Sequence, residues 1–268
     1  DEAAPRNPVM LTRLFAVTSA NSMALEKAGI SMGYVPPSGR VDLDGTGEPT
    51  GILREGAANP VRAKAREESG GARGLEDMVK LALNEYLRYG ITAVLDPGVQ
   101  PDLMAAYASL HAKGELPIRV SAMPSWHGIM FGEAPAGFPP PVEAGLLPGF
   151  GDEFFRFGNL KMAIDGGLGS KTALMHEHYR DFTRATVPLR LDANKLGSYV
   201  RDAHGKGWGL GVHCCGDLAQ DIAVSHMVDA LEGKPALPWH RHHIVHGYFP
   251  TEYALRMMAE YGLAVSVQ

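Results

Sequence analysis

Several classes of protein are excluded by what this chain lacks. Its 268 residues include only two cysteines, Cys214 and Cys215, and adjacent cysteines rarely meet disulfide geometry, so we expect no disulfide framework. Acidic residues outnumber basic ones by 30 to 25, which leaves a net charge of -5 and no basic surface to neutralise phosphates. No apolar run approaches the roughly 20 residues that span a bilayer. We therefore expect a cytoplasmic protein with neither a nucleic acid nor a membrane as partner.

The chain is rich in apolar residues and in turn-forming residues. Hydrophobic residues make up 45% and charged residues 21%, and 32 glycines and 19 prolines are present. This composition is typical of a loop-rich globular protein and excludes a disordered or coiled-coil chain. A chain of this length can bury a sizeable core, either as one large α/β unit or as two smaller domains.

From about residue 75 onward, helical and strand-like patterns alternate. Apolar residues at helical spacing lead to Gly90, and the run 91–95 then favours a buried strand ended by Asp96 and Pro97. This alternation recurs along the chain and predicts parallel strands joined by helices. The expected strands are 91–95, 117–123, 157–164, 209–213, 242–246 and 263–267, with intervening helices that begin near Asp102, Asp192, Asp217 and Pro250.

The first part of the chain does not share this alternation. Turn signals such as Asp44-Gly45 and the segment 47–51 are typical of a small lobe built from short strands. We therefore expect two regions: a strand- and turn-rich lobe at residues 1–60 and a barrel-like α/β region at residues 61–268.

Three residues at the expected strand ends suggest chemistry. The active site of a parallel barrel lies at the carboxyl ends of its strands, where the sequence places Lys161, His213 and His246 in succession. Imidazole nitrogens bind zinc and similar ions, and a lysine amine that reacts with carbon dioxide gives a carbamate able to bridge metals. The residues alone leave open a structural role, with Lys161 in a salt bridge and both histidines satisfied by hydrogen bonds.

Other polar residues near the strand ends have weaker claims. Ser125, Asp165 and Gly166 are candidates to line a substrate pocket. His176 and His178 have the spacing of a strand-borne metal pair, but they lie in the loop after the strand 157–164, and this order argues against a metal role.

The two cysteines and Asp217 have ordinary structural explanations. Cys214 and Cys215 are beside His213, but buried cysteine more often serves as a small hydrophobe than as a thiolate ligand. Asp217 is expected to cap the helix that follows it.

Seven segments, in this order along the chain, resemble the amidohydrolase superfamily, and in particular the branch that contains N-substituted formamide deformylases. The segments are 7–9, 21–30, 47–55, 90–94, 160–170, 212–217 and 241–246. Because they extend over nearly the whole chain, the resemblance does not depend on any one short motif. It implies a distorted (β/α)8 barrel of the TIM type with a small β-sandwich built from both chain ends.

The resemblance also implies a site and a reaction. Lys161 corresponds to the family's carboxylated lysine on strand four, and His213 and His246 correspond to the metal ligands on strands five and six. One or two divalent ions, with zinc the expected metal, would be held there. The implied reaction is hydrolysis of an amide-type C–N bond of a small molecule by a metal-activated hydroxide.

Four departures from the family pattern qualify this expectation. The family's His-x-His pair on strand one and its metal-binding aspartate on strand eight have no counterpart in this sequence. We therefore expect strands two to seven here, with the histidine pair before Asp1 and the aspartate after Gln268, which leaves the activity of this chain alone open. Ala16 and Val245 also replace a histidine and a glutamate that relatives often carry.

Two other functions remain open at this point. A degenerate barrel could bind a small ligand or a partner without turnover, and a metal-free barrel enzyme could use Lys161 as a Schiff-base nucleophile. Assembly into a homodimer is also left open by the sequence.

Overall fold

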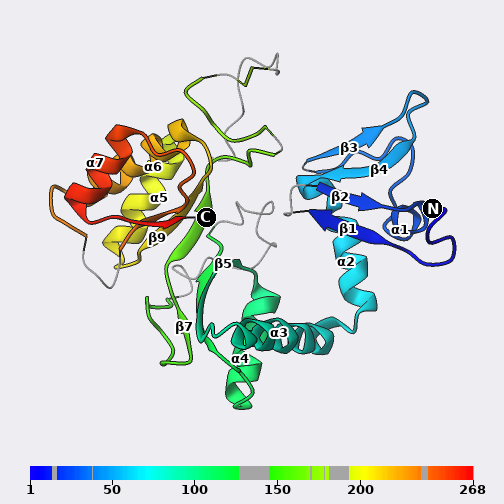
Figure 1. Ribbon diagram of the computed structural model, residues 1–268, viewed down its shortest axis with the longest axis horizontal. Coiled ribbons are helices and arrows are strands. Elements are labelled where there is room, and N and C mark those ends of the chain that lie inside the picture. Colours follow the sequence, from blue (N-terminus) through cyan, green and yellow to red (C-terminus); the bar gives the residue numbers. More distant parts are fainter. Residues whose placement is uncertain are drawn as a thin grey trace. The chain divides into compact units, whose positions relative to one another are not determined.

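A computed structural model of the chain describes residues 1–13, 17–37, 39–126, 145–169, 171–177, 179–180, 193–236 and 241–267 (Figure 1). The chain divides into two compact units, Asp1–Met78 and Val79–Gln268. Among the helices in these ranges, none combines the length and apolar character needed to cross a membrane.

The first unit is built around an antiparallel sheet. Its four strands are arranged in the order β1-β2-β4-β3. A core that includes Leu53, Ala57 and Val61 lies between this sheet and the helical segments. The elements are β1 (Met10–Arg13), β2 (Val17–Ala20), α1 (Ser22–Lys27), β3 (Arg40–Leu43), β4 (Pro49–Arg54), the short 3-10 helix η1 (Glu55–Ala58), α2 (Asn59–Glu68) and the start of α3 (Gly71–Arg88).

The division between the units falls after Met78, whereas the sequence placed it after residue 60. Helix α2 accounts for the difference because it packs on the first unit. Val61 is buried in that unit's core, and the Glu68 carboxylate pairs with Lys27 Nζ at 2.6 Å. The turn residues of the sequence predicted the strands of the first unit, but they gave no indication that helix α2 belongs to it.

The second unit is an α/β structure of parallel strands, as predicted. One sheet has the order β5-β6-β7 and the other the order β11-β10-β9-β8. A parallel bridge between Ser125 and Lys161 and a hydrogen bond of 2.9 Å from the Trp126 N–H to the Lys161 carbonyl join the two sheets. The strands are β5 (Ala93–Val99), β6 (Arg119–Pro124), β7 (Phe155–Phe157), β8 (Leu160–Ala163), β9 (Leu210–Cys214), β10 (His243–His246) and β11 (Ala264–Val267).

Helices connect these strands where the periodicity predicted them. Thr251 caps α7 by accepting a hydrogen bond from the Ala254 N–H. Asp217 is the first residue of α6 and its carboxylate accepts the N–H of His176, so it fastens a loop to the helix while Gly216 occupies the N-cap position. The helices are α4 (Pro101–Ala112), α5 (Ala193–Gly205), α6 (Asp217–Ala230) and α7 (Glu252–Tyr261).

Two strands differ from their sequence-based outlines. The expected strand 157–164 is interrupted, because Gly158 and Asn159 separate β7 from β8, and the Gly158 N–H donates to the Ala122 carbonyl at 2.7 Å. Strand β5 continues through Asp96 and Pro97 to Val99, so the prediction that these two residues end it was wrong. Proline lacks an N–H but is tolerated on an edge strand, and in the part of the chain described β5 is hydrogen-bonded along one edge, to β6.

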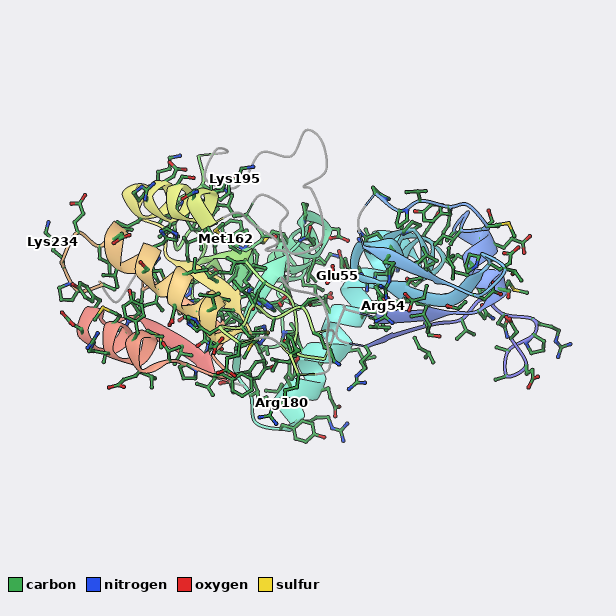
Figure 2. All side chains as sticks on the ribbon, turned by 90° about the horizontal axis from the view of Figure 1, so that it is seen from above. Arg54, Glu55, Met162, Arg180, Lys195 and Lys234 are labelled. Carbon is green, nitrogen blue, oxygen red and sulfur yellow. The ribbon has the colours of Figure 1, made fainter. Side chains whose placement is uncertain are left out.

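Alternate residues of β8, β9 and β10 face two different environments. One set packs against helices α5, α6 and α7, which lie together beside these strands (Figure 1). Met162, labelled in Figure 2, belongs to this set. Successive residues of a strand point to opposite faces, so Lys161, His213 and His243 lie on the face turned away from these helices. The helix-facing strand residues are Leu160, Met162, Leu210, Val212, Cys214 and Ile244.

Candidate metal centre

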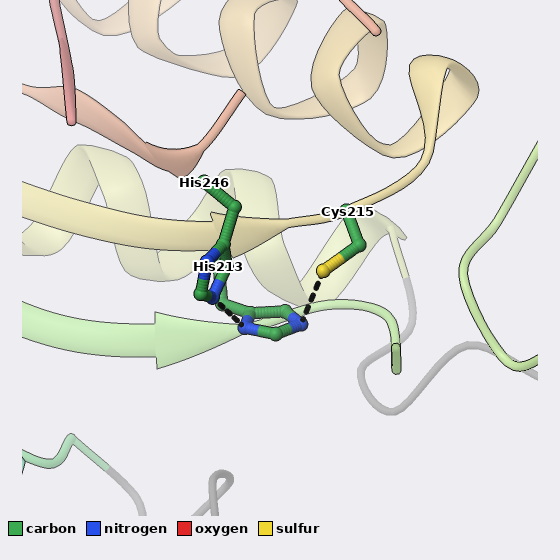
Figure 3. Close-up of side chains that lie close together, drawn as sticks. All are labelled: His213, Cys215 and His246. Carbon is green, nitrogen blue, oxygen red and sulfur yellow. Dashed lines mark hydrogen bonds between the residues drawn. The ribbon is translucent and has the colours of Figure 1, made fainter. Parts of the chain in front are cut away.

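His213 and His246 meet at the carboxyl ends of two neighbouring parallel strands, β9 and β10. His213 Nδ1 lies 2.8 Å from His246 Nε2, and the rings are edge to face with centroids 4.5 Å apart (Figure 3). The structure therefore brings together the two histidines that the sequence placed at successive strand ends, from positions 33 residues apart.

His246 reaches this position through an unusual backbone conformation. In the strand register it pairs with Cys214, which faces the helices. Simple alternation would therefore turn His246 toward the helices as well. Its φ of 90° turns the side chain toward His213 instead. A non-glycine residue at positive φ destabilises the fold by about 1–3 kcal/mol, and such residues are concentrated at functional sites. The strained backbone therefore makes His246 a candidate functional residue.

Cys215 completes a group of three potential ligands. Its sulfur lies 3.5 Å from His213 Nε2, and one donor atom from each of His213, Cys215 and His246 falls within 4.8 Å of the others (Figure 3). Nitrogen and sulfur donors of this kind suit zinc. The residues present therefore fit a divalent ion of borderline softness.

The two cysteines differ in their surroundings. Cys214 is fully buried in the core against the helices, and burial raises the pKa of its thiol well above the ordinary value. Cys214 thus has the hydrophobic role expected for both residues. Sequence reasoning gave Cys215 the same role, and its place one residue beyond the end of β9, beside His213, was the available signal for a different one.

Asp165 fastens the turn that carries Cys215. Its carboxylate is fully buried and accepts hydrogen bonds from three main-chain N–H groups, those of Leu174, Cys215 and Gly216, at 3.0, 3.1 and 2.8 Å. Oδ1 also lies 3.6 Å from His213 Nε2. Hydrogen bonds to an ionised carboxylate are stronger than those between neutral groups. The sequence proposed Asp165 for the substrate pocket, and the structure shows its carboxylate holding main-chain groups of the site.

Gly166 orients the ring of His213. Its carbonyl oxygen lies 3.0 Å from His213 Nε2, and a carbonyl only accepts, so Nε2 carries the proton of the neutral ring. His213 Nδ1 is then an acceptor, and His246 Nε2 donates to it. A Cβ atom at residue 166 would lie 2.0 Å from Thr172 Oγ1, so only glycine fits here.

Lys161 lies on the same face of the strands, one layer closer to their amino ends. The register pairs Lys161 with Gly211, whereas Ala163 is level with His213. The lysine is fully buried, and its Nζ donates to the Met162 carbonyl at 3.1 Å. Ser125, the other pocket candidate, is paired with Lys161 across the bridge between the sheets.

The remaining histidines lie elsewhere. His176 Nε2 contacts the Asp221 carboxylate on α6 at 2.8 Å, outside the cluster at His213. His242 is buried on the helix side, where its Nδ1 accepts the N–H of Leu210. His178, Ala16 and Gln268 lie outside the described residues.

The whole chain, residues 1–268, matches the Amidohydrolase family, and the chain belongs to it. It is 27% identical over 279 residues to a Bacillus subtilis (strain 168) protein named as an amidohydrolase, YtcJ, covering 100% of this chain and 49% of the relative. It is 28% identical over 232 residues to an N-substituted formamide deformylase of Arthrobacter pascens, covering 84% of this chain and 41% of the relative. The family prediction is confirmed, and the chain spans about half or less of the length of these curated relatives.

Solved structures share the fold. A crystal structure of an uncharacterized metal-dependent hydrolase from Pyrococcus horikoshii OT3 superposes with a TM-score of 0.73 at 24% sequence identity. The match covers 99% of this chain and 50% of the other. Because the match covers nearly all of this chain, both of its units have counterparts in that structure.

Proposed function

We propose that this chain forms the metal-binding part of a hydrolase that cleaves an amide-type C–N bond of a small molecule. The observation that carries the proposal is the meeting of His213 and His246 at neighbouring strand ends, with Cys215 beside them. Membership of the Amidohydrolase family and the similarity to an N-substituted formamide deformylase support the reaction class.

His213 and His246 would hold a divalent ion, with zinc the metal that suits their nitrogen atoms and the nearby sulfur. When bound, such an ion supplies Lewis-acid polarisation of a carbonyl group and makes water acidic enough to deprotonate near neutral pH. Imidazole must be neutral to ligate, and the hydrogen bonds of His213 already define which nitrogen carries the proton.

Lys161 is the further ligand in this proposal, in the form of a carboxylated lysine. The uncharged amine is the form that reacts with carbon dioxide, and Lys161 is fully buried, away from bulk water. Carboxylation replaces a potential cation by an anion, which suits a site that holds a divalent cation.

Asp165 and Gly166 hold the site in shape. The three N–H groups on the Asp165 carboxylate hold the loop after β8 against the turn after β9, and the Gly166 carbonyl keeps the His213 ring in one orientation. Groups that orient ligands in this way typically change metal affinity or activity about 10- to 100-fold when removed. The substrate pocket would thus be shaped by residues that hold the metal ligands in place, namely Asp165, Gly166 and Ser125.

The proposal is tested by the metal content and hydrolytic activity of the full polypeptide. We expect His213→Ala and His246→Ala to contain less bound metal than the parent protein, as measured by inductively coupled plasma mass spectrometry. His176→Ala, which removes a histidine paired with Asp221, should retain the metal. The parent protein should hydrolyse members of a panel of N-substituted formamides and other small amides. Equal metal content in all three variants would overturn the site, and bound metal without hydrolysis of any amide would make the protein a binding module.

A further inference from the structure

A row of four residues crosses neighbouring strands beneath the histidine pair. Ser125 is bridged to Lys161, Lys161 pairs with Gly211, and Gly211 pairs with His243. Residues in register on parallel strands point to the same face. The four therefore share the face that carries His213, one layer closer to the amino ends of the strands.

Gly211 has no side chain, and the His243 ring and the Met123 methyl group pack directly over it. A Cβ atom at residue 211 would lie 2.6 Å from both Cε1 and Nε2 of His243, and 2.2 Å from Cε of Met123. The Nε2 edge of the imidazole therefore lies over the glycine, on the side from which Lys161 projects.

The proton position on His243 follows from its neighbours. Asn159 Nδ2 donates to the Arg241 carbonyl at 2.8 Å and lies 3.0 Å from His243 Nδ1. A carbonyl only accepts, so the amide group of Asn159 is oriented and His243 Nδ1 is an acceptor. An Nδ1 atom that accepts a hydrogen bond carries no proton, so the ring is the tautomer with its proton on the other nitrogen. The single ring proton is therefore on Nε2, and this edge is a donor.

Two buried polar atoms of the row have no hydrogen-bond partner among the described residues. They are Ser125 Oγ and His243 Nε2, on either side of Lys161. A buried donor left unpaired costs about 1–3 kcal/mol, and native structures contain few of them. Both atoms offer a proton, so what would satisfy them is an acceptor group with oxygen atoms, located at Lys161.

We propose that His243 and Ser125 are positioning residues whose Nε2–H and Oγ–H donate hydrogen bonds to the carboxylate oxygens of a carboxylated Lys161. This inference rests on the carboxylation of Lys161 in the proposed function. In that step the neutral Nζ attacks the carbon of carbon dioxide and an N–C bond forms. One C=O electron pair moves to oxygen and a proton leaves nitrogen for water, which gives –NH–COO⁻.

The same two donors would also suit a free bicarbonate ion bound against an ammonium group on Lys161. The two sources differ in one bond. A carbamate formed from ¹³C-bicarbonate on ¹⁵N-labelled lysine shows a one-bond ¹³C–¹⁵N coupling, whereas bound bicarbonate gives a singlet. The experiment is therefore ¹³C NMR of the zinc-loaded full polypeptide, labelled with ¹⁵N-lysine and titrated with ¹³C-bicarbonate.

We expect a coupled signal in the parent protein and none in Lys161→Arg. Because a hydrogen bond to a charged acceptor contributes more than a neutral one, His243→Phe and Ser125→Ala should each raise the bicarbonate concentration for half occupancy about 10-fold. His243→Gln, which keeps an N–H donor, should recover part of the loss. The matched controls His176→Phe and Ser198→Ala, at exposed positions, should leave the titration unchanged.

Circular dichroism checks the folding of every variant, and metal content is measured alongside. If His243→Phe does not fold, Ser125→Ala, which removes only one oxygen atom, still tests the positioning role. Unchanged half occupancy in Ser125→Ala and in the folded His243 variants overturns the positioning role while the proposed hydrolase stands. A singlet in the parent protein overturns the carbamate itself. Metal bound by His213 and His246 is scored separately, so the two failures are distinguishable.

Discussion

The two faces of strands β8, β9 and β10 are built from alternate residues of the same short segments. The helix-facing set, which includes Met162 and Val212, is apolar and fully buried. The opposite set includes Lys161, His213 and His243, and His243 Nε2 has no hydrogen-bond partner among the residues that the structure describes. Packing alone would favour apolar residues on both faces. The polar face therefore reflects chemistry retained at a cost in stability.

Substitution of His246 should have the largest effect on the polar face. We expect His246→Ala in the full polypeptide to reduce metal affinity more than 100-fold, because removal of a ligand exceeds the roughly 10- to 100-fold effect of losing a residue that merely orients one. His242→Ala is the neighbouring control, since His242 faces the helices. His242→Ala should lower stability but leave metal affinity unchanged. The metal affinity of both variants is measured by competition with a chelator. Similar metal loss in both variants would contradict the distinction between the faces.

Truncation on the helix side should affect stability and leave the metal site intact. We expect Met162→Ala to lower the free energy of unfolding by about 2–5 kcal/mol, the usual result of deleting a large buried apolar side chain. Urea denaturation measures the change. The adjacent variant Lys161→Met, on the opposite face, should not lower stability because it replaces a buried charged group by an apolar one of similar length. A larger loss for Lys161→Met than for Met162→Ala would reverse the comparison.

Asp165 joins the loop after β8 to the turn after β9, at the carboxyl ends of these strands. We expect Asp165→Asn to weaken metal binding about 10- to 100-fold, because three main-chain N–H groups lose an ionised acceptor and the turn at Cys215 loosens. Isothermal titration with zinc measures the affinity. Asp217→Asn, which alters a carboxylate that fastens the loop at His176, is the control and should bind zinc as the parent does. Parent-like zinc affinity in Asp165→Asn would show that the turn holds without the charge.

The smallest effect is a pH dependence of stability from His243. The pKa of its folded form is lowered from 6.5 to about 4 by burial, so the unfolded chain binds more protons between these values. Stability is then complete above about pH 6.5 and falls as the pH drops toward 4, and about 2 kcal/mol of this residue's contribution is lost by about pH 5. His243→Phe should flatten that part of the profile measured by urea denaturation of metal-free protein. An unchanged slope would place the titration on another group.

Much of the second unit could be predicted because its signals are local. Apolar periodicity and terminal glycines or capping residues located the strands and helices, and the helix expected to begin near Pro250 is α7, which Thr251 caps. The errors came where a distant neighbour decides the outcome. Strand β5 runs through Asp96 and Pro97 because it pairs with β6, and α2 joins the first unit because Val61 enters its core.

The candidate site was predictable in part for the same reason. His213 and His246 follow from their places at strand ends, and the structure brings them into contact. The one local signal that separated Cys215 from Cys214 was its place one residue beyond the end of β9, and which face each side chain occupies is decided by the tertiary structure. No local pattern singled out His243, because its position beside Lys161 depends on Gly211, a residue of a different strand.

The sequence by itself determined the succession of parallel strands, the family and the order of Lys161, His213 and His246 along the chain, because periodicity, turn residues and motif spacing are properties of contiguous segments. Tertiary structure decided which atoms meet. The meeting of His246 with His213, the burial of Asp165 under three N–H groups and the packing of His243 over Gly211 all join segments that are far apart in the chain. A shift of one residue in the strand register would turn Lys161, His213 and His243 to the other face.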